Sequence, residues 1–95
     1  MLKIEVEERD EAVIISLNGE LSAEFIKEFD GVFNKYINSK FKVIVIDLKS
    51  MPYINSFGIS RMVKISRAVI DGGRDFILIN MNSNIQQIFR MTTFD

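Results

Sequence analysis

The chain lacks cysteine and histidine altogether, and it contains a single proline among its 95 residues. Without these two side chains the sequence offers no disulfide, no thiol nucleophile, no imidazole base and no zinc site built from sulfur or imidazole. No apolar run approaches the ~20 residues that a membrane-spanning helix needs. The N-terminal segment MLKIEVEERD is charged and has no apolar signal core. We therefore expect a soluble, cytoplasmic protein with no membrane partner.

A strong excess of one charge is missing as well. The 12 basic and 13 acidic residues give a formal net charge of −1, so we expect no direct binding to nucleic acid. No pair of acids, metal-ligand cluster or nucleophile with its base emerges, so we expect no enzyme activity, no cofactor and no metal. A chain of this length buries roughly 60–70% of its unfolded surface. With 47% hydrophobic residues, we expect one domain over residues 1–95.

Two strands are predicted before the first helix. Leu2–Glu7 alternates apolar and polar residues, and Ala12–Asn18 is rich in β-branched residues. The link Glu8–Glu11 is too short for a helical crossover, which favours an antiparallel hairpin. Gly19 is the expected turn residue after this hairpin, and Ser22 is a plausible N-cap for the helix that follows.

Three helices are predicted from the apolar period. The first begins at Ala23, with a stripe formed by Phe25, Phe29, Val32, Phe33 and Tyr36. The second begins at about Ser56 and ends at the glycine pair of Asp71–Gly73. Its inner side is expected to hold Ile59, Met62, Val63, Ser66 and Val69. A short third helix is capped by Asn82 or Ser83 and buries Ile85, Ile88 and Phe89.

Two further strands lie between these helices. Phe41–Leu48 is apolar at nearly every position, which is typical of a central strand covered on both faces, and Asp75–Asn80 is expected to be another buried strand. Right-handed crossovers make the later strands parallel. The sequence therefore predicts a small α/β domain of order β-β-α-β-α-β-α, with a mixed, mostly parallel sheet and packed helices. The final MTTFD is too short to assign.

The stretch MPYINSFGIS, Met51 to Ser60, places a serine at the start of the second predicted helix. The simplest interpretation of Ser56 is a helix N-cap, whose hydroxyl accepts from a backbone N–H and stabilises the helix by about 1 kcal/mol. Asn55 is the alternative cap, and it would leave the Ser56 hydroxyl free. A nucleophilic serine lacks a histidine base. A phosphate-binding loop is disfavoured because the segment NSFG holds one glycine and no Walker pattern.

Regulatory phosphorylation is a further interpretation of Ser56. A phosphoserine carries about −1.5 to −2 charges, and the positive end of the helix dipole tolerates negative charge at this position. The domain would then stay folded while the charge of its surface changed. A partner that packs apolar residues against that edge would be repelled, so Ser56 is suited to switch partner binding.

Several short motifs occur in a fixed order along the chain. They are Leu17–Leu21 (LNGEL), Asp47–Leu48, Asn55–Ser60 (NSFGIS), Gly72–Gly73, and Ile85 with Ile88 and Phe89. In this order, and over nearly the whole chain, the sequence resembles the STAS domain family, in particular the bacterial anti-sigma factor antagonists. Those proteins have a G-E-L turn, an Asp-Leu pair after a strand, a segment resembling D-S-S-G-L-G at the second helix, a Gly-Gly pair and a short amphipathic helix.

The resemblance implies a function for Ser56, which is similar to the serine that a cognate ATP-dependent anti-sigma kinase phosphorylates. The unphosphorylated protein would bind that kinase and release its sigma factor. Phosphorylation would break the complex, and a serine phosphatase would restore it. The residues expected to contact the partner are Ser22, Asn55, Ser56, Phe57, Gly58, Ser60 and Arg61. The alternative is a STAS-like scaffold module in a regulatory assembly without a sigma factor, and the sequence does not separate the two.

The chain departs from the family pattern at three of these positions. Asn55 stands where many relatives have aspartate, and Ser22 stands where an acid is common. Both changes alter the charge near the acceptor serine. Phe57 replaces a small residue, and it is expected either to anchor the core or to make the partner surface more apolar. The chain also ends sooner than family members commonly do.

Overall fold

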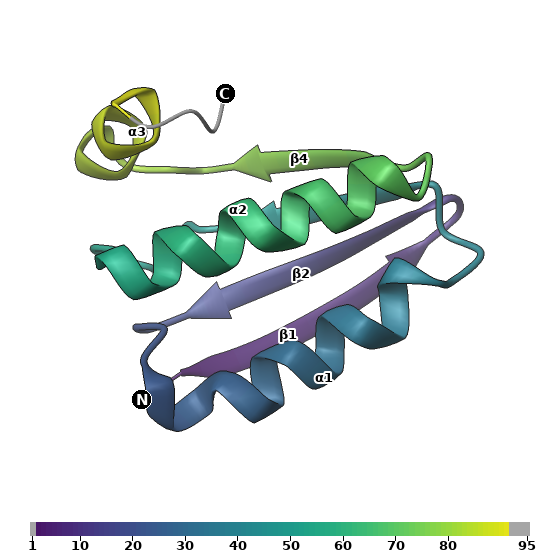
Figure 1. Ribbon diagram of the computed structural model, residues 1–95, viewed down its shortest axis with the longest axis horizontal. Helices are drawn as coiled ribbons and strands as arrows, with labels where there is room; N and C mark the ends of the chain where they lie inside the picture. Colours follow the sequence, from purple (N-terminus) through teal and green to yellow (C-terminus); the bar gives the residue numbers. More distant parts are fainter. Residues whose placement is uncertain (1, 92–95) are drawn as a thin grey trace.

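The computed structural model describes residues 2–91, and its elements follow the predicted order (Figure 1). The elements are β1 (Lys3–Arg9), β2 (Ala12–Asn18), the 3-10 turn η1 (Ala23–Phe25), α1 (Ile26–Ile37), β3 (Val43–Asp47), α2 (Ser56–Asp71), β4 (Asp75–Ile79) and α3 (Ser83–Arg90). The fold class predicted from the sequence is confirmed. The last four residues, which belong to the unassigned MTTFD, lie outside the described range.

The four strands form one mixed sheet in the order β1-β2-β3-β4. β1 and β2 pair antiparallel as the short hairpin predicts, while β2–β3 and β3–β4 pair parallel. Gly19 takes the turn after β2 with a φ of 111°, and Gly73 follows α2 with a φ of 80°. Both are conformations that glycine adopts readily. The predicted turn at Gly19 and the predicted end of the second helix at the glycine pair are therefore confirmed.

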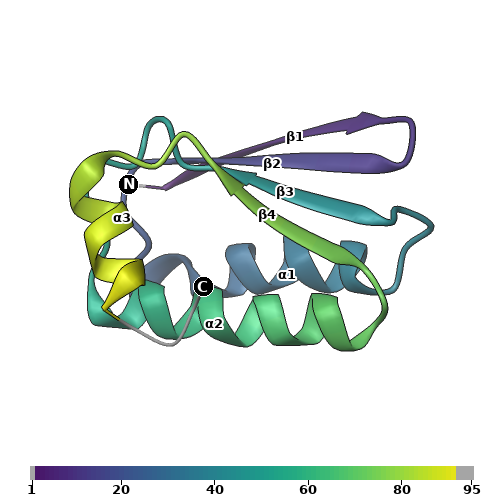
Figure 2. The ribbon, with the colours of Figure 1, turned by 90° about the horizontal axis from the view of Figure 1, so that it is seen from above.

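Both long helices cover the same face of the sheet (Figure 2). The sheet order explains this arrangement, because both crossovers advance in one direction along the sheet and right-handed crossovers then place α1 and α2 on one side. α3 lies beyond the carboxyl ends of β3 and β4, beside the start of α2 (Figures 1 and 2). The other face of the sheet is therefore not covered by any element of residues 2–91.

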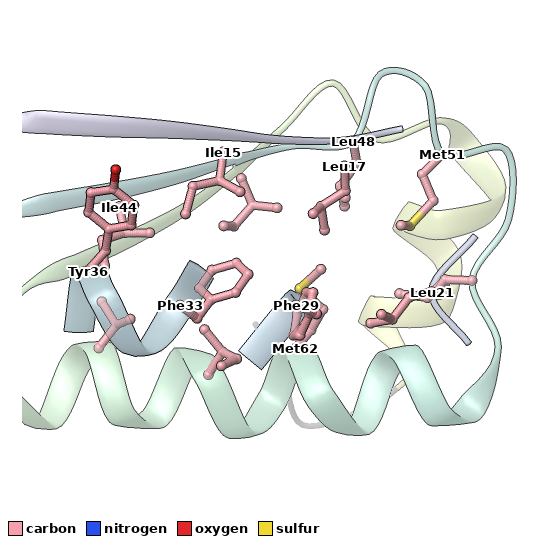
Figure 3. Close-up of a cluster of buried hydrophobic side chains, with 14 of the residues drawn as sticks. Ile15, Leu17, Leu21, Phe29, Phe33, Tyr36, Ile44, Leu48, Met51 and Met62 are labelled. Carbon is pink, nitrogen blue, oxygen red and sulfur yellow. The ribbon is translucent and has the colours of Figure 1, made fainter. Parts of the chain in front are cut away.

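The hydrophobic core lies between the sheet and the two helices (Figure 3). Phe29 and Phe33 on α1 meet Ile15 and Ile44 from the sheet and Met62 from α2, and all five are fully buried. The predicted apolar stripes are confirmed in outline. Residues of those stripes that are only partly buried are Phe25, Val32, Ile59, Val63 and Ile88.

The expectations that β3 is covered on both faces and that β4 is a buried strand are wrong. In β3, Ile44 and Ile46 are buried, whereas Val43 and Val45 are partly exposed on the opposite face. β4 is an edge strand without a fully buried residue, and Ile77 is 43% exposed. The physical reason is the one-sided helical layer, which leaves the other side chains of these apolar strands in contact with solvent.

Candidate functional site

The loop between β3 and α2 is fixed from both sides before it reaches Ser56. The Asp47 carboxylate accepts a hydrogen bond from the Lys49 backbone N–H at 2.9 Å and another from the Asn80 side chain at 3.1 Å. Farther along, Met51 and Ile54 are buried in the core. A loop held by buried side chains and polar contacts presents the start of α2 in one defined position.

Asn55 is the N-cap of α2. Its backbone is extended, and its side-chain oxygen accepts a hydrogen bond from the Gly58 N–H at 2.8 Å. The simplest interpretation of the sequence, with Ser56 as the cap, is therefore wrong, and the alternative cap Asn55 is correct. Ser56 becomes the first helical residue, where it is exposed and its hydroxyl has no hydrogen-bond partner among residues 2–91. Its hydroxyl is chemically available.

Gly58 allows the first turn of α2 to sit directly on the core. It is buried, and a Cβ at this position would lie only 2.8 Å from Cγ1 of Ile54 and 3.5 Å from the Asn55 side-chain oxygen. A larger residue would have to displace Ile54 or the cap itself. Gly58 thus leaves room for Ile54 and the Asn55 side chain, and because it is buried it presents almost no surface of its own.

Phe57 lies on the surface next to Ser56, so it does not anchor the core. The residue is 36% exposed, and the Arg61 guanidinium carbon lies 5.7 Å from the ring centroid. Arg61 is half-buried and its guanidinium also approaches the Asp30 carboxylate at 3.9 Å. Ser60, one turn after Ser56, is exposed. The start of α2 therefore combines an exposed aromatic ring, hydroxyl groups and an arginine whose charge is already partnered.

Ser22 occupies the N-cap position of η1 with an extended backbone, but its side chain makes no capping hydrogen bond. Its loop is tied to the loop before α2 by two contacts. The Gly19 N–H donates to the Ser50 carbonyl at 3.0 Å, and the Tyr53 hydroxyl donates to the Glu20 carboxylate at 2.7 Å. The structure therefore brings the segment that carries Ser22 against the segment that leads to Ser56.

Tyr53 was not among the predicted site residues. It is 54% exposed and lies between the only proline and the cap of α2. The hydrogen bond from its hydroxyl to Glu20, together with the negative charge of that carboxylate, raises the pKa of Tyr53 above its usual 10. The phenol thus remains a neutral donor at physiological pH. The sequence shows only a tyrosine directly after the single proline, and its partner Glu20 is 33 residues away along the chain.

Two hollows of the described surface do not include Ser56. One, of about 430 Å³, lies between α2, β4 and α3 and is lined mainly by apolar side chains. The other, of about 370 Å³, lies at one end of the sheet, among Glu5, Asp47 and Lys49. Within residues 2–91 no three acidic residues converge as metal ligands, and no helix there is long and apolar enough to span a membrane.

Replacing Asn55 by alanine should lower the free energy of unfolding by about 1 kcal/mol, because the Gly58 N–H loses its partner. Asn55→Asp should keep the cap and add a negative charge that the helix dipole favours. Urea unfolding followed by circular dichroism measures both effects. Ser56→Ala is the matched control and should change stability by less than about 0.5 kcal/mol. A cost at Ser56 equal to that at Asn55 would contradict the capping assignment.

Known proteins resemble this chain in sequence and in fold. A family model described as STAS domain matches residues 3–95. A protein of Thermotoga maritima, provisionally named an anti-sigma factor antagonist, is 28% identical over 87 residues, which are 90% of this chain and 77% of that protein. The crystal structure of TM1081 from Thermotoga maritima, named in the same way, has a TM-score of 0.82 at 25% identity and covers 93% of this chain and 76% of that one.

A structure of SpoIIAA from Bacillus in its phosphorylated form is also similar. Its TM-score is 0.79 at 18% identity, and the match covers 97% of this chain and 85% of that chain. At this level of identity the likeness concerns the fold alone.

Proposed function

The chain belongs to the STAS domain family, and from this premise we propose that it is an anti-sigma factor antagonist switched by phosphorylation of Ser56. One observation carries the proposal. Asn55 caps α2, so the hydroxyl of the first helical residue is exposed and has no partner among residues 2–91. The name of the Thermotoga maritima relative supports the coarser part of the proposal, a regulatory binding protein.

The partner is proposed to dock on the surface around Ser56, which we name the α2 docking face. It comprises Ser22, Tyr53, Asn55, Ser56, Phe57, Ser60 and Arg61, with Gly58 beneath them. Tyr53 and Phe57 supply exposed aromatic area, and such residues often carry much of the energy of an interface. The predicted contact set thus gains Tyr53, while Gly58 is assigned a supporting role because it is buried.

The proposed partner is an ATP-binding serine kinase that holds a sigma factor in the cytoplasm. The unphosphorylated protein binds this kinase and the sigma factor is released. Transfer of phosphate to the Ser56 hydroxyl then changes the charge of the α2 docking face, and a serine phosphatase reverses the change. The free N–H groups and the dipole at the start of a 16-residue helix tolerate the added charge, so the switch does not require unfolding.

The test is incubation of the purified protein with its cognate kinase and ATP, followed by mass spectrometry of the intact and digested chain. One phosphate is expected, and it is expected on Ser56. Ser56→Ala should abolish incorporation, whereas Ser60→Ala, a matched loss of an exposed hydroxyl one turn along α2, should leave it unchanged. Phosphate on Ser60, or on any residue of the Ser56→Ala variant, would contradict the proposal.

A further inference from the structure

No helix covers the sheet face opposite α1 and α2 (Figure 2), and the strand register places a strip of apolar side chains on it. Ile14, Val45 and Ile77 are neighbours in register across β2, β3 and β4. Side chains alternate along a strand, so these three point away from the core residues Ile15, Ile44 and Ile46. Ala12, Val43 and Ile79 extend the strip on either side. We name this surface the open sheet face, and no element of residues 2–91 covers it.

The dimensions of the strip fit one helix. Three adjacent strands span roughly 10 Å at a spacing of about 4.8 Å, which is close to the diameter of an α-helix with its side chains. Ile77 at the edge is 43% exposed, and Ile14 and Val45 are partly exposed. A contiguous exposed apolar patch of this kind is a feature of interaction sites.

Charged residues surround the strip, and most of them are acidic. By the strand register, Glu5, Glu7, Asp47 and Asp75 point to the open sheet face, against the two strand cations Lys3 and Arg9. Lys49 adds a third cation beside Glu5 and Asp47, in the hollow at one end of the sheet. The Arg9 guanidinium already pairs with the Glu7 carboxylate. The remaining acids lie on two sides of the apolar strip, so the surface is complementary to an apolar ridge flanked by positive charges.

The same charges disfavour the other occupants. An anionic membrane would be repelled by the acidic rim. A second copy would bring a second acidic rim against the first, and a four-stranded face of this length offers a footprint on the order of 300–400 Å². That footprint is below the roughly 800 Å² per partner typical of stable interfaces. A single helix needs less surface and can place lysine or arginine opposite the acids.

We propose that the open sheet face is a second docking surface, which binds a basic amphipathic helix of a partner protein. This surface lies on the side of the sheet opposite the helical layer to which the α2 docking face belongs (Figure 2). Binding there is therefore independent of phosphorylation at Ser56, and the two surfaces can be occupied together.

The probe is a synthetic amphipathic peptide with leucine on one helical face and lysine on the other. It is titrated into nitrogen-15-labelled protein while amide shifts are followed by NMR. We expect saturable shifts in β2, β3 and β4 and unchanged signals at the start of α2. Val45→Lys should weaken binding at least tenfold, whereas Val6→Lys, a 40% exposed valine on the helical side of β1, should not. The phosphomimetic Ser56→Glu should also bind normally.

The controls separate this surface from non-specific adsorption. The same peptide with glutamate in place of lysine should not bind. Equal binding of both peptides, shifts centred on α2, or full binding by the Val45→Lys variant would overturn the proposal. Ile77→Lys on the edge strand is a second variant if Val45→Lys fails to fold. Sedimentation of the protein alone provides the last control, because a dimer that Val45→Lys dissociates would identify a second copy as the occupant and also overturn it.

Discussion

Replacing Phe33 by alanine should remove roughly a fifth or more of the free energy of unfolding. Phe33 is fully buried, and its ring lies 4.7 Å from that of Phe29 between centroids, with a tilt of 47°. Truncation of a buried phenylalanine costs about 3–5 kcal/mol because burial is lost and a cavity remains. A domain of this size has a total stability of roughly 5–15 kcal/mol. The variant should therefore unfold at a clearly lower denaturant concentration than the parent protein.

Urea unfolding followed by circular dichroism measures this loss. With a denaturant slope of about 1–3 kcal/mol per molar urea, the midpoint should fall by more than about 1 M. Phe57→Ala is the matched control, since it removes the same atoms from a ring that is 36% exposed, and it should cost about 1 kcal/mol or less. Equal midpoint shifts for the two variants would mean that the helical stripe of α1 does not form the core.

The order of elements was predictable because each one has a local signal. The short link after β1 excluded a crossover, and the apolar stripe of α1 has a clear helical period. Gly19 and Gly73 mark chain reversals where a positive φ is needed. These signals depend on neighbouring residues only, which a sequence displays directly.

The error at β3 and β4 has a different origin. A continuous apolar run is consistent with burial on two faces, but the number of covered faces depends on the path of the chain through the sheet. In the order β1-β2-β3-β4 both crossovers turn the same way, so one helical layer forms and Val43, Val45 and Ile77 remain at the surface. The apolar run does form a strand, β3, and the apolar residues of β3 and β4 that face away from the helices form the open sheet face.

The candidate site was predictable only in part for the same reason. Asn55 and Ser56 are both good N-cap residues, and the choice between them depends on the backbone geometry that lets the Asn55 oxygen reach the Gly58 N–H at 2.8 Å. The contact of Tyr53 with Glu20 joins two loops that are distant in sequence. No residue near Tyr53 in the sequence indicates this contact, so the sequence alone could not assign Tyr53 to the candidate site.

Phosphorylation of Ser56 should weaken the complex with the kinase about 100-fold or more, equivalent to about 2.7 kcal/mol. The added charge of about −1.5 to −2 would enter an interface next to the exposed rings of Tyr53 and Phe57. Arg61 is already engaged by Asp30 and by the Phe57 ring. An unpaired charge in a desolvated apolar contact is costly, so the loss is expected to appear mainly as faster dissociation.

Isothermal titration of the kinase with the phosphorylated and unphosphorylated protein measures the loss, and Ser56→Glu should give an intermediate value because it adds a single charge. Ser60→Glu is the matched control, with the same charge one turn farther along α2, and it should have a smaller effect. The melting temperature of the phosphorylated protein should change by only a few degrees, since the helix dipole favours the charge. Equal affinity of the two forms would remove the switch, and a large drop in melting temperature would show that any loss of binding comes from unfolding. Weaker binding together with an unchanged fold would assign the switch to the charge at the start of α2. At that position the phosphate is favoured by the helix dipole and at the same time repels the partner.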